Sequence, residues 1–449
     1  MKGFLYKYGI YIVLLIFAIL TTAFSSNLVW WDSAVYISMG KYIWSLGDLG
    51  LWEPARPVFW PLLLGFFWKI GLEVIPLASY IGSLLSIFSI YLIYLIIKDY
   101  KDTQTALIFS FIFSLSIPLL NYSSKILVDI PAMFFSLLSI YFIFKEKHYF
   151  WVGIFIGLAS LTKFVYLLFI PLIFILLPFR KKPLVEYALG LFIILFPYFF
   201  IMFLIYKNPF QSLILGKELI ATVTGNEFCT NSFTFYIKTL LKELPVLMLS
   251  LIPFYMIYKK REWRIVLLTL LAFVPLIYHT FFLNCKDIRY AFIFLPYLLI
   301  LSAIGFAFLY KKMKILLIIL IIVQILNSSI LIYDFEKEPG FSTNHKEFYT
   351  YDIKGGILST NPYISLYNDI KVNNLMYYPI FNSKKIAEIE KELDRANDIF
   401  IDTCDIPCPS QENDCEEKKT ALLKKISDNY NIIFEKIEGN CELKIYKKQ

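Results

Sequence analysis

An aspartate follows two tryptophans near the start of the chain, in the sequence Trp30-Trp31-Asp32-Ser33. It comes directly after a first hydrophobic run, where a membrane helix would reach the boundary between lipid and water. Tryptophan is enriched at that boundary, and a carboxylate held there is unfavourable unless it is solvated or used. Asp32 is therefore a candidate catalytic carboxylate. The alternative is that it only caps the next helix, since aspartate is a favoured N-cap residue.

Other charged residues stand at the same predicted membrane depth. Asp129 begins a later span, and the basic residues there are Arg56, Lys163 and Arg289. Each has a simpler explanation: Asp129 with a following proline starts a helix, Lys163 extends its ammonium to the headgroups, and Arg289 anchors an interface. A random distribution of the two acids would not favour one leaflet. Together the residues suit a reaction in which a carboxylate takes a proton and cations stabilise growing negative charge.

Long apolar runs dominate the chain as far as about residue 333. It is 58% hydrophobic and only 17% charged, against about 25% charged residues in soluble domains. A run of about 20 apolar residues crosses a bilayer. We therefore predict a polytopic α-helical membrane protein with eleven spans, near 9–27, 77–97, 105–121, 129–144, 149–162, 164–179, 184–206, 240–258, 264–283, 290–309 and 314–333. The first is not predicted to be a cleaved signal peptide, because no cleavage-site pattern follows it.

Basic residues in alternate short loops predict the orientation. They are Lys2 and Lys7, Lys98 and Lys101, Lys145 and Lys147, Arg180 to Lys182, Lys259 to Arg261 with Arg264, and Lys311, Lys312 and Lys314. Cytoplasmic loops are enriched in such residues, so the N-terminus is predicted inside and the C-terminus outside the plasma membrane. The pattern also places 57–75 at the outer interface and makes 149–178 a hairpin of two short spans. The net charge of +8 is therefore a result of topology, and no nucleic-acid partner is expected.

All six cysteines fall on the predicted outer side: Cys229, Cys285, Cys404, Cys408, Cys415 and Cys441. An even set on an oxidising face indicates disulfides. Cys229 and Cys285 lie in two outer loops, and their other potential partners are in the tail, so we predict that they pair with each other. A zinc site is the alternative for the tail, but no Cys-x-x-Cys occurs and the only histidine there, His345, is distant. We predict no metal site.

The polar C-terminal part is predicted to be a separate domain, so that residues 1–334 form the membrane domain and 335–449 an extracytoplasmic α/β domain stapled by disulfides. Strand patterns occur at 356–360, 374–378, 398–402, 431–435 and 442–446, and helical patterns at 383–395 and 416–429. We expect a roughly parallel core. The domain has neither a dinucleotide fingerprint nor a phosphate-binding loop.

Five motifs in this order resemble the GT-C glycosyltransferases, a superfamily of integral-membrane enzymes. The most similar groups are the dolichyl-phosphate-mannose–protein mannosyltransferases and the aminoarabinose transferases that modify lipid A. The resemblance covers residues 10–310 and rests on Asp32-x-x-x-Tyr36, Arg56-Pro57-x-x-x-Pro61, Asp129-x-Pro131-Ala132, Gly157-Leu-Ala-Ser-Leu-Thr-Lys163 and Arg289-Tyr290.

This resemblance implies a glycosyltransferase that moves a hexose or pentose from a polyprenyl- or dolichyl-phosphate donor to an acceptor hydroxyl, on a protein, lipid or glycan. Asp32 would be catalytic with support from Asp129. Arg56, Lys163, Arg289 and Tyr290 would hold the donor phosphate, and Trp31 and Tyr36 would line the substrate pocket. Attack opposite the lipid phosphate would invert the anomeric centre. No cofactor is required, and nothing in the sequence supports a divalent cation.

Two other classes of protein remain as alternatives. A secondary transporter would contain internal repeats and charged residues near the middle of the membrane; no repeat is recognisable, and both acids lie at the rim. A protein that only displays its tail domain at the cell surface would not need the pair Asp32 and Asp129.

Overall fold

A computed structural model describes residues 2–24, 29–146, 148–177, 181–222, 232–260, 262–283, 285–333, 346–351, 356–376, 383–408, 414–438 and 440–449. The chain divides into two compact units. The first holds residues 1–27, 78–213 and 224–338, and the second holds 28–77, 214–223 and 339–449. The second unit therefore joins the loop that carries Asp32 and Arg56 to the C-terminal part of the chain. The predicted domain boundary after residue 334 stays a prediction.

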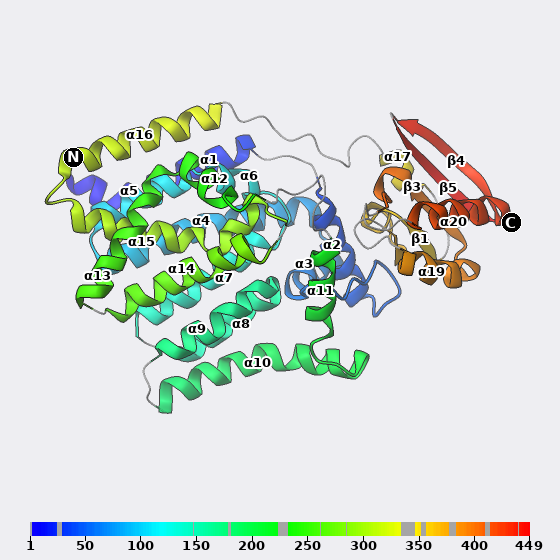
Figure 1. Ribbon diagram of the computed structural model, residues 1–449, viewed down its shortest axis with the longest axis horizontal. Helices are drawn as coiled ribbons and strands as arrows, with labels where there is room; N and C mark the ends of the chain where they lie inside the picture. Colours follow the sequence, from blue (N-terminus) through cyan, green and yellow to red (C-terminus); the bar gives the residue numbers. More distant parts are fainter. Residues whose placement is uncertain are drawn as a thin grey trace. The chain divides into compact units, whose positions relative to one another are not determined.

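The first unit is a bundle of helices (Figure 1). Their bounds are α1 Lys2–Phe24, α4 Val74–Tyr100 (which begins in the second unit), α5 Thr103–Ser114, α6 Ile117–Ser123, α7 Asp129–Phe144, α8 Tyr149–Thr162, η1 Phe164–Leu168, α9 Phe169–Leu176, α10 Lys181–Tyr206, α12 Phe235–Glu243, η2 Pro245–Leu251, α13 Ile252–Lys260, α14 Trp263–Phe281, η3 Ile288–Ile293, α15 Leu295–Leu309 and α16 Lys314–Tyr333.

Within the described residues, four helices are long and apolar enough to cross a membrane: α4, α10, α14 and α16. Two bent helix pairs add a crossing each if each pair is one span; α5 and α6 meet at 61°, and α12 meets η2 with α13 at 116°. Shorter apolar helices occupy the other predicted spans: α1, α7, α8, η1 with α9, and α15. The membrane class is confirmed, and the count of eleven spans stays a prediction.

Small residues let three helices of this bundle approach closely. A Cβ atom on Gly153 of α8 would lie 2.2 Å from the Tyr187 carbonyl oxygen of α10, and one on Gly190 would lie 2.2 Å from the Phe150 oxygen. Such contacts between small residues are typical of helix packing in lipid. Ser139 of α7 also donates to the Val152 carbonyl of α8 at 3.1 Å. This packing fixes the first residue of α7 and the residue after α8, which are Asp129 and Lys163.

The second unit combines helices with a five-stranded sheet. Its elements are α2 Trp31–Trp44, α3 Phe59–Lys69, α11 Gln211–Thr222 (shared with the first unit), α17 Lys346–Tyr349, β1 Ile357–Ser359, α18 Tyr363–Tyr367, β2 Val372–Leu375, α19 Ser383–Glu392, η4 Leu393–Arg395, β3 Asp398–Asp402, η5 Thr403–Asp405, α20 Cys415–Asn429, β4 Tyr430–Glu438 and β5 Cys441–Lys448. Helices α19 and α20 bury Ile389 and Ile426 in one hydrophobic cluster with Ile399 of β3.

The sheet has the strand order β2-β1-β3-β5-β4. Strand β1 is parallel to β2 and β3, whereas β5 is antiparallel to β3 and β4. Strands β1 to β4 therefore share one direction, so the expectation of a roughly parallel core is correct for them and wrong for β5. The reason is that β4 and β5 are consecutive and pair as a hairpin, which makes them antiparallel.

Disulfides staple the C-terminal part as predicted. Cys404 pairs with Cys441 and joins the end of β3 to β5, and Cys408 pairs with Cys415 at the start of α20. Asp402 lies close enough to Cys404 and Cys441 to form a three-ligand metal group, but both sulfur atoms are used in the disulfide. Cys285 is also disulfide-bonded. Its predicted partner Cys229 lies outside the described residues, so that pairing stays a prediction.

Candidate functional site

Asp32 lies in the first turn of α2, whose N-cap is Trp30. The alternative interpretation, in which Asp32 is itself the cap, is therefore wrong. The carboxylate is favoured there because the N-terminal end of a helix carries partial positive charge. Its Oδ1 lies 2.8 Å from Nη1 of Arg56, and the two side chains keep 20% and 12% of their surface exposed, so the ion pair is largely shielded yet reachable.

Arg56, in the loop between α2 and α3, forms ion pairs with two carboxylates, those of Asp32 and Glu53. Its Nε lies 2.5 Å from Oε2 of Glu53, and its Nη1 donates to the Tyr36 hydroxyl at 3.4 Å. The guanidinium also lies 5.3 Å from the centre of the Tyr36 ring. The planar fork of arginine suits such multiple contacts. The arrangement holds Asp32 in place, and a direct role of Arg56 at the donor phosphate stays a prediction.

Tyr363, which comes from the C-terminal part of the chain, lies beside this cluster. Its ring meets that of Trp31 edge to face, with centroids 6.3 Å apart. Burial, followed by the negative charges of Asp405 and, more weakly, Asp32, raises the pKa of Tyr363 far above its usual value. Tyr363 therefore stays neutral, and its hydroxyl donates to the Val29 carbonyl at 2.8 Å. Sequence analysis did not single it out.

A second cluster lies in the first unit, around the pair Asp129 and Lys163. The Lys163 ammonium donates to Oδ1 of Asp129 at 2.5 Å, and the carboxylate side chain keeps only 3% of its surface exposed. A carboxylate this deeply buried depends on its partner for compensation. Asp129 is the first residue of α7 and Lys163 the residue that ends α8, so the hairpin turn brings them together.

Two cations lie close to the ring of Tyr290. The Lys163 ammonium is 4.7 Å from the centre of its ring, and the Arg289 guanidinium is 5.2 Å away. Arg289 also pairs with Asp287, with Nε 3.2 Å from Oδ2. The predicted residues Lys163, Arg289 and Tyr290 are thus brought together with Asp129, although they come from distant parts of the sequence.

Further residues of this cluster were missed in the sequence. Tyr122 donates to Asp287 at 3.4 Å, and the buried Lys125 lies 4.5 Å from the centre of the Tyr122 ring. The buried His279 packs at 6.1 Å from the Tyr290 ring. Lys125 could have been identified in the sequence, because it precedes Asp129 by four residues. His279 lies inside an apolar span, and no pattern around it indicates this cluster.

The cluster in the first unit is electropositive. The cations are Lys125, Lys163 and Arg289, and the carboxylates beside them are Asp129 and Asp287. Asp32 lies in the second unit and is paired with Arg56. The composition of the cation-rich cluster suits a phosphate, and the Asp32 carboxylate is held in place by Arg56.

Comparisons with known proteins found a family model that matches part of the chain and solved structures of similar fold. Residues 77–211 match the family model described as dolichyl-phosphate-mannose-protein mannosyltransferase. No curated protein matches the chain. Among solved structures, ArnT from Cupriavidus metallidurans bound to undecaprenyl phosphate is similar, with a TM-score of 0.64 and 10% identity over 97% of each chain.

Two further structures share the fold. The oligosaccharyltransferase AglB from Archaeoglobus fulgidus, in complex with an inhibitory peptide and a dolichol-phosphate, has a TM-score of 0.57 and 12% identity, over 88% of this chain and 69% of that one. The mycobacterial arabinofuranosyltransferase AftD has a TM-score of 0.53 and 12% identity, over 98% of this chain and 41% of that one. Identities this low show a common fold.

The chain shares its fold with these membrane glycosyltransferases, and residues 77–211 match the protein mannosyltransferase family model. The chain therefore resembles the protein mannosyltransferase family and the ArnT-type transferases, as the sequence motifs predicted. These similarities do not favour the alternatives of a transporter or a display protein.

Proposed function

We propose that this protein transfers a sugar from a polyprenyl-phosphate donor to an acceptor hydroxyl at the outer face of the membrane, with inversion at the anomeric carbon. The observation that carries the proposal is the cation-rich cluster of Lys163 and Arg289 around Tyr290. Its composition suits a lipid-linked phosphate. The ArnT and AglB structures are described with undecaprenyl phosphate and dolichol-phosphate, which supports the same class of donor here.

Asp32 acts as the general base in this scheme. The acceptor oxygen forms its bond to the anomeric carbon while its proton passes to the Asp32 carboxylate; general base catalysis of this type contributes about 10²–10⁴-fold in enzymes. Arg56 fixes the carboxylate, at 2.8 Å. The bond between the anomeric carbon and the phosphate oxygen breaks at the same time, and its electron pair stays on the phosphate.

The cations of the first unit stabilise that phosphate. Lys163 and Arg289 face the growing charge, and Asp129 positions Lys163 through their 2.5 Å contact. Fixed charges aimed at the developing charge of a transition state lower the barrier more than the same charges in water.

A direct assay tests the function. The purified full-length protein, given a panel of polyprenyl-phosphate hexoses and pentoses, is expected to release polyprenyl phosphate in the presence of surface extract as acceptor. Mass spectrometry of surface glycans from a deletion strain should show one missing sugar. Absence of turnover and of binding for every donor, together with unchanged glycans, would contradict the proposal.

Arg289→Gln should raise the donor KM about tenfold or more and also lower kcat, because the phosphate gains charge as the bond breaks. The matched control is Arg264→Gln. Arg264 also pairs with an acid, Glu146 at 2.6 Å, but belongs to a predicted cytoplasmic loop. An equal loss of thermal stability and activity in both variants would mean that Arg289 only anchors the helix.

The topology gives a separate prediction. Lys145 pairs with Asp99 at 2.6 Å and Arg264 with Glu146 at 2.6 Å, so three predicted cytoplasmic loops share one end of the bundle. After mild reduction, an impermeant thiol reagent should label Cys404 and Cys441 in intact cells, whereas a Lys145→Cys variant should add label only after lysis. Tail labelling that requires lysis would overturn the outer-face site.

A further inference from the structure

Helix α18 of the C-terminal part contacts α2 at both ends of the segment that carries Asp32. The buried Tyr363 hydroxyl donates to the Val29 carbonyl at 2.8 Å, immediately before the Trp30 cap. Further along, Ser365 donates to the Ser38 hydroxyl at 2.7 Å. All of these residues belong to the second unit.

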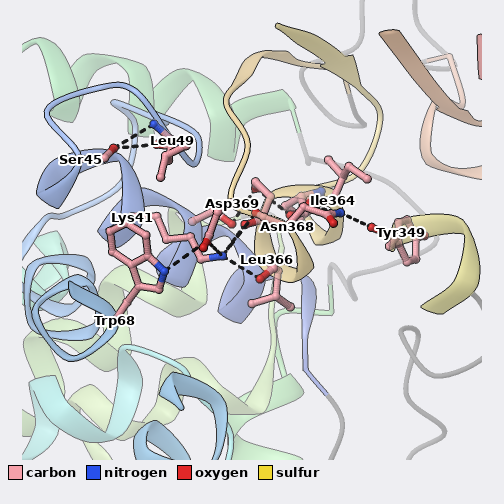
Figure 2. Close-up of polar contacts among 12 residues, drawn as sticks. Lys41, Ser45, Leu49, Trp68, Tyr349, Ile364, Leu366, Asn368 and Asp369 are labelled. Carbon is pink, nitrogen blue, oxygen red and sulfur yellow. Dashed lines mark hydrogen bonds and ion pairs between the residues drawn. The ribbon is translucent and has the colours of Figure 1, made fainter. Parts of the chain in front are cut away.

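Lys41 forms the other anchor. Its ammonium, on a side chain that is 5% exposed, donates to the carbonyls of Ser365 at 3.1 Å and Leu366 at 2.9 Å. It also contacts the Asn368 carbonyl at 3.4 Å and the Asp369 carboxylate at 2.9 Å (Figure 2). These carbonyls lie at the C-terminal end of α18, where a cation is favoured by the partial negative charge of the helix end. A buried ammonium with four oxygen partners is well compensated.

Helix α3 and the segment after α2 also contact the residues that follow α18. Trp68 of α3 donates to Asp369 at 3.2 Å. Gly40 and Gly65 bring α2 and α3 into backbone contact, since a Cβ atom on Gly65 would lie 2.3 Å from the Gly40 oxygen. After α2, Gly50 pairs with the strand-like segment before β2, with its amide 2.8 Å from the Ile370 oxygen.

We infer that α18 is a positioning element of the catalytic site: Tyr363 and the carbonyls that receive Lys41 hold α2 so that Asp32 points at the acceptor. The expected effect on kcat rests on the proposed function, whereas the expected loosening of α2 does not. Tyr363 and Lys41 are positioning residues, because they act on the reaction only through Asp32. A shift of about 1 Å in a catalytic group can lower a rate about 100-fold, so a small loosening of α2 is expected to be visible in kcat.

The test compares two substitutions of the same kind in the full-length protein. Tyr363→Phe removes the hydroxyl that holds Val29 and keeps the ring beside Trp31. The matched control Tyr430→Phe removes a hydroxyl that donates to the Leu393 and Ala396 carbonyls inside the C-terminal part. We expect Tyr363→Phe to lower kcat about tenfold with an unchanged donor KM, and Tyr430→Phe to leave both unchanged.

Hydrogen–deuterium exchange supplies a readout that needs no substrate. Amides in the first turns of α2 should exchange about five- to tenfold faster in Tyr363→Phe, while those of α19 and α20 keep their wild-type rates; Tyr430→Phe should show the reverse pattern. If the Lys41→Met variant folds, its amides should exchange faster along the whole of α2. If that variant does not fold, the exchange measured in Tyr363→Phe is the deciding result.

The outcomes separate this inference from the proposed function. Unchanged α2 exchange in Tyr363→Phe, or equal kinetic losses in Tyr363→Phe and Tyr430→Phe, would overturn the positioning role. If the wild-type protein turned over no lipid-linked sugar, the proposed function would fail while the exchange experiment still decided whether α18 holds α2.

Discussion

Asp32→Asn should lower kcat by about 10²–10⁴-fold with little change in the donor KM. The amide keeps the size of the side chain and can still accept from Arg56, but it cannot take the acceptor proton. Arg56 retains its 2.5 Å contact with Glu53, so the loop is expected to keep its conformation. The measurement is steady-state transfer by the purified variant, with thermal unfolding as a check on folding.

The matched control for this variant is Asp48→Asn. Asp48 is an exposed acid in the turn after α2, and its substitution removes the same charge without touching the ion pair. Wild-type kcat is expected for it. Near-normal transfer by Asp32→Asn would rule out Asp32 as the base and make Asp129 the next candidate.

Lys163→Gln should have the second largest effect, because it leaves Asp129 buried without its cation. Breaking a buried ion pair from one side destabilises a protein by about 3–5 kcal/mol. The donor KM should also rise about 10–100-fold, because the variant loses one charged hydrogen bond to the phosphate. Thermal unfolding and donor kinetics measure the two effects separately.

The double variant Asp129→Asn with Lys163→Gln separates folding from donor binding. It removes both charges, so most of the stability should return, while the donor KM should stay high because the cation is still missing. Lys145→Gln is the matched control: its pair with Asp99 is about 40% exposed and such pairs contribute about 0–1 kcal/mol. Wild-type kinetics in the double variant would show that Lys163 only stabilises the fold.

The membrane class, the motif residues and most element positions follow from the sequence because they depend on local pattern. Apolar runs of fixed length reveal spans, and strand and helix periodicities located β3, β5, α19 and α20 to within a few residues. Asp129 and Lys163 were expected at one depth because each stands at the end of an apolar run, and their 2.5 Å contact agrees with that placement.

The partners of the charged residues could not be read from the sequence. Glu53 and Asp32 both form ion pairs with Arg56, and Asp287 forms an ion pair with Arg289. In the sequence, Glu53 and Asp287 resemble ordinary loop residues. The mixed sheet was mispredicted in part because strand direction depends on how consecutive strands connect. No pattern in the sequence singled out Lys41, which is buried against α18.

Residue type, spacing and apolar length were enough to predict a membrane protein that resembles the GT-C glycosyltransferases, with two acids and a set of cations at its predicted outer rim. The pairing of the charges, the approach of two cations to the Tyr290 ring and the contact of α18 with the helix of Asp32 became visible in the tertiary structure. These contacts join residues up to 334 positions apart. Their formation depends on packing across the whole fold, which no local pattern encodes.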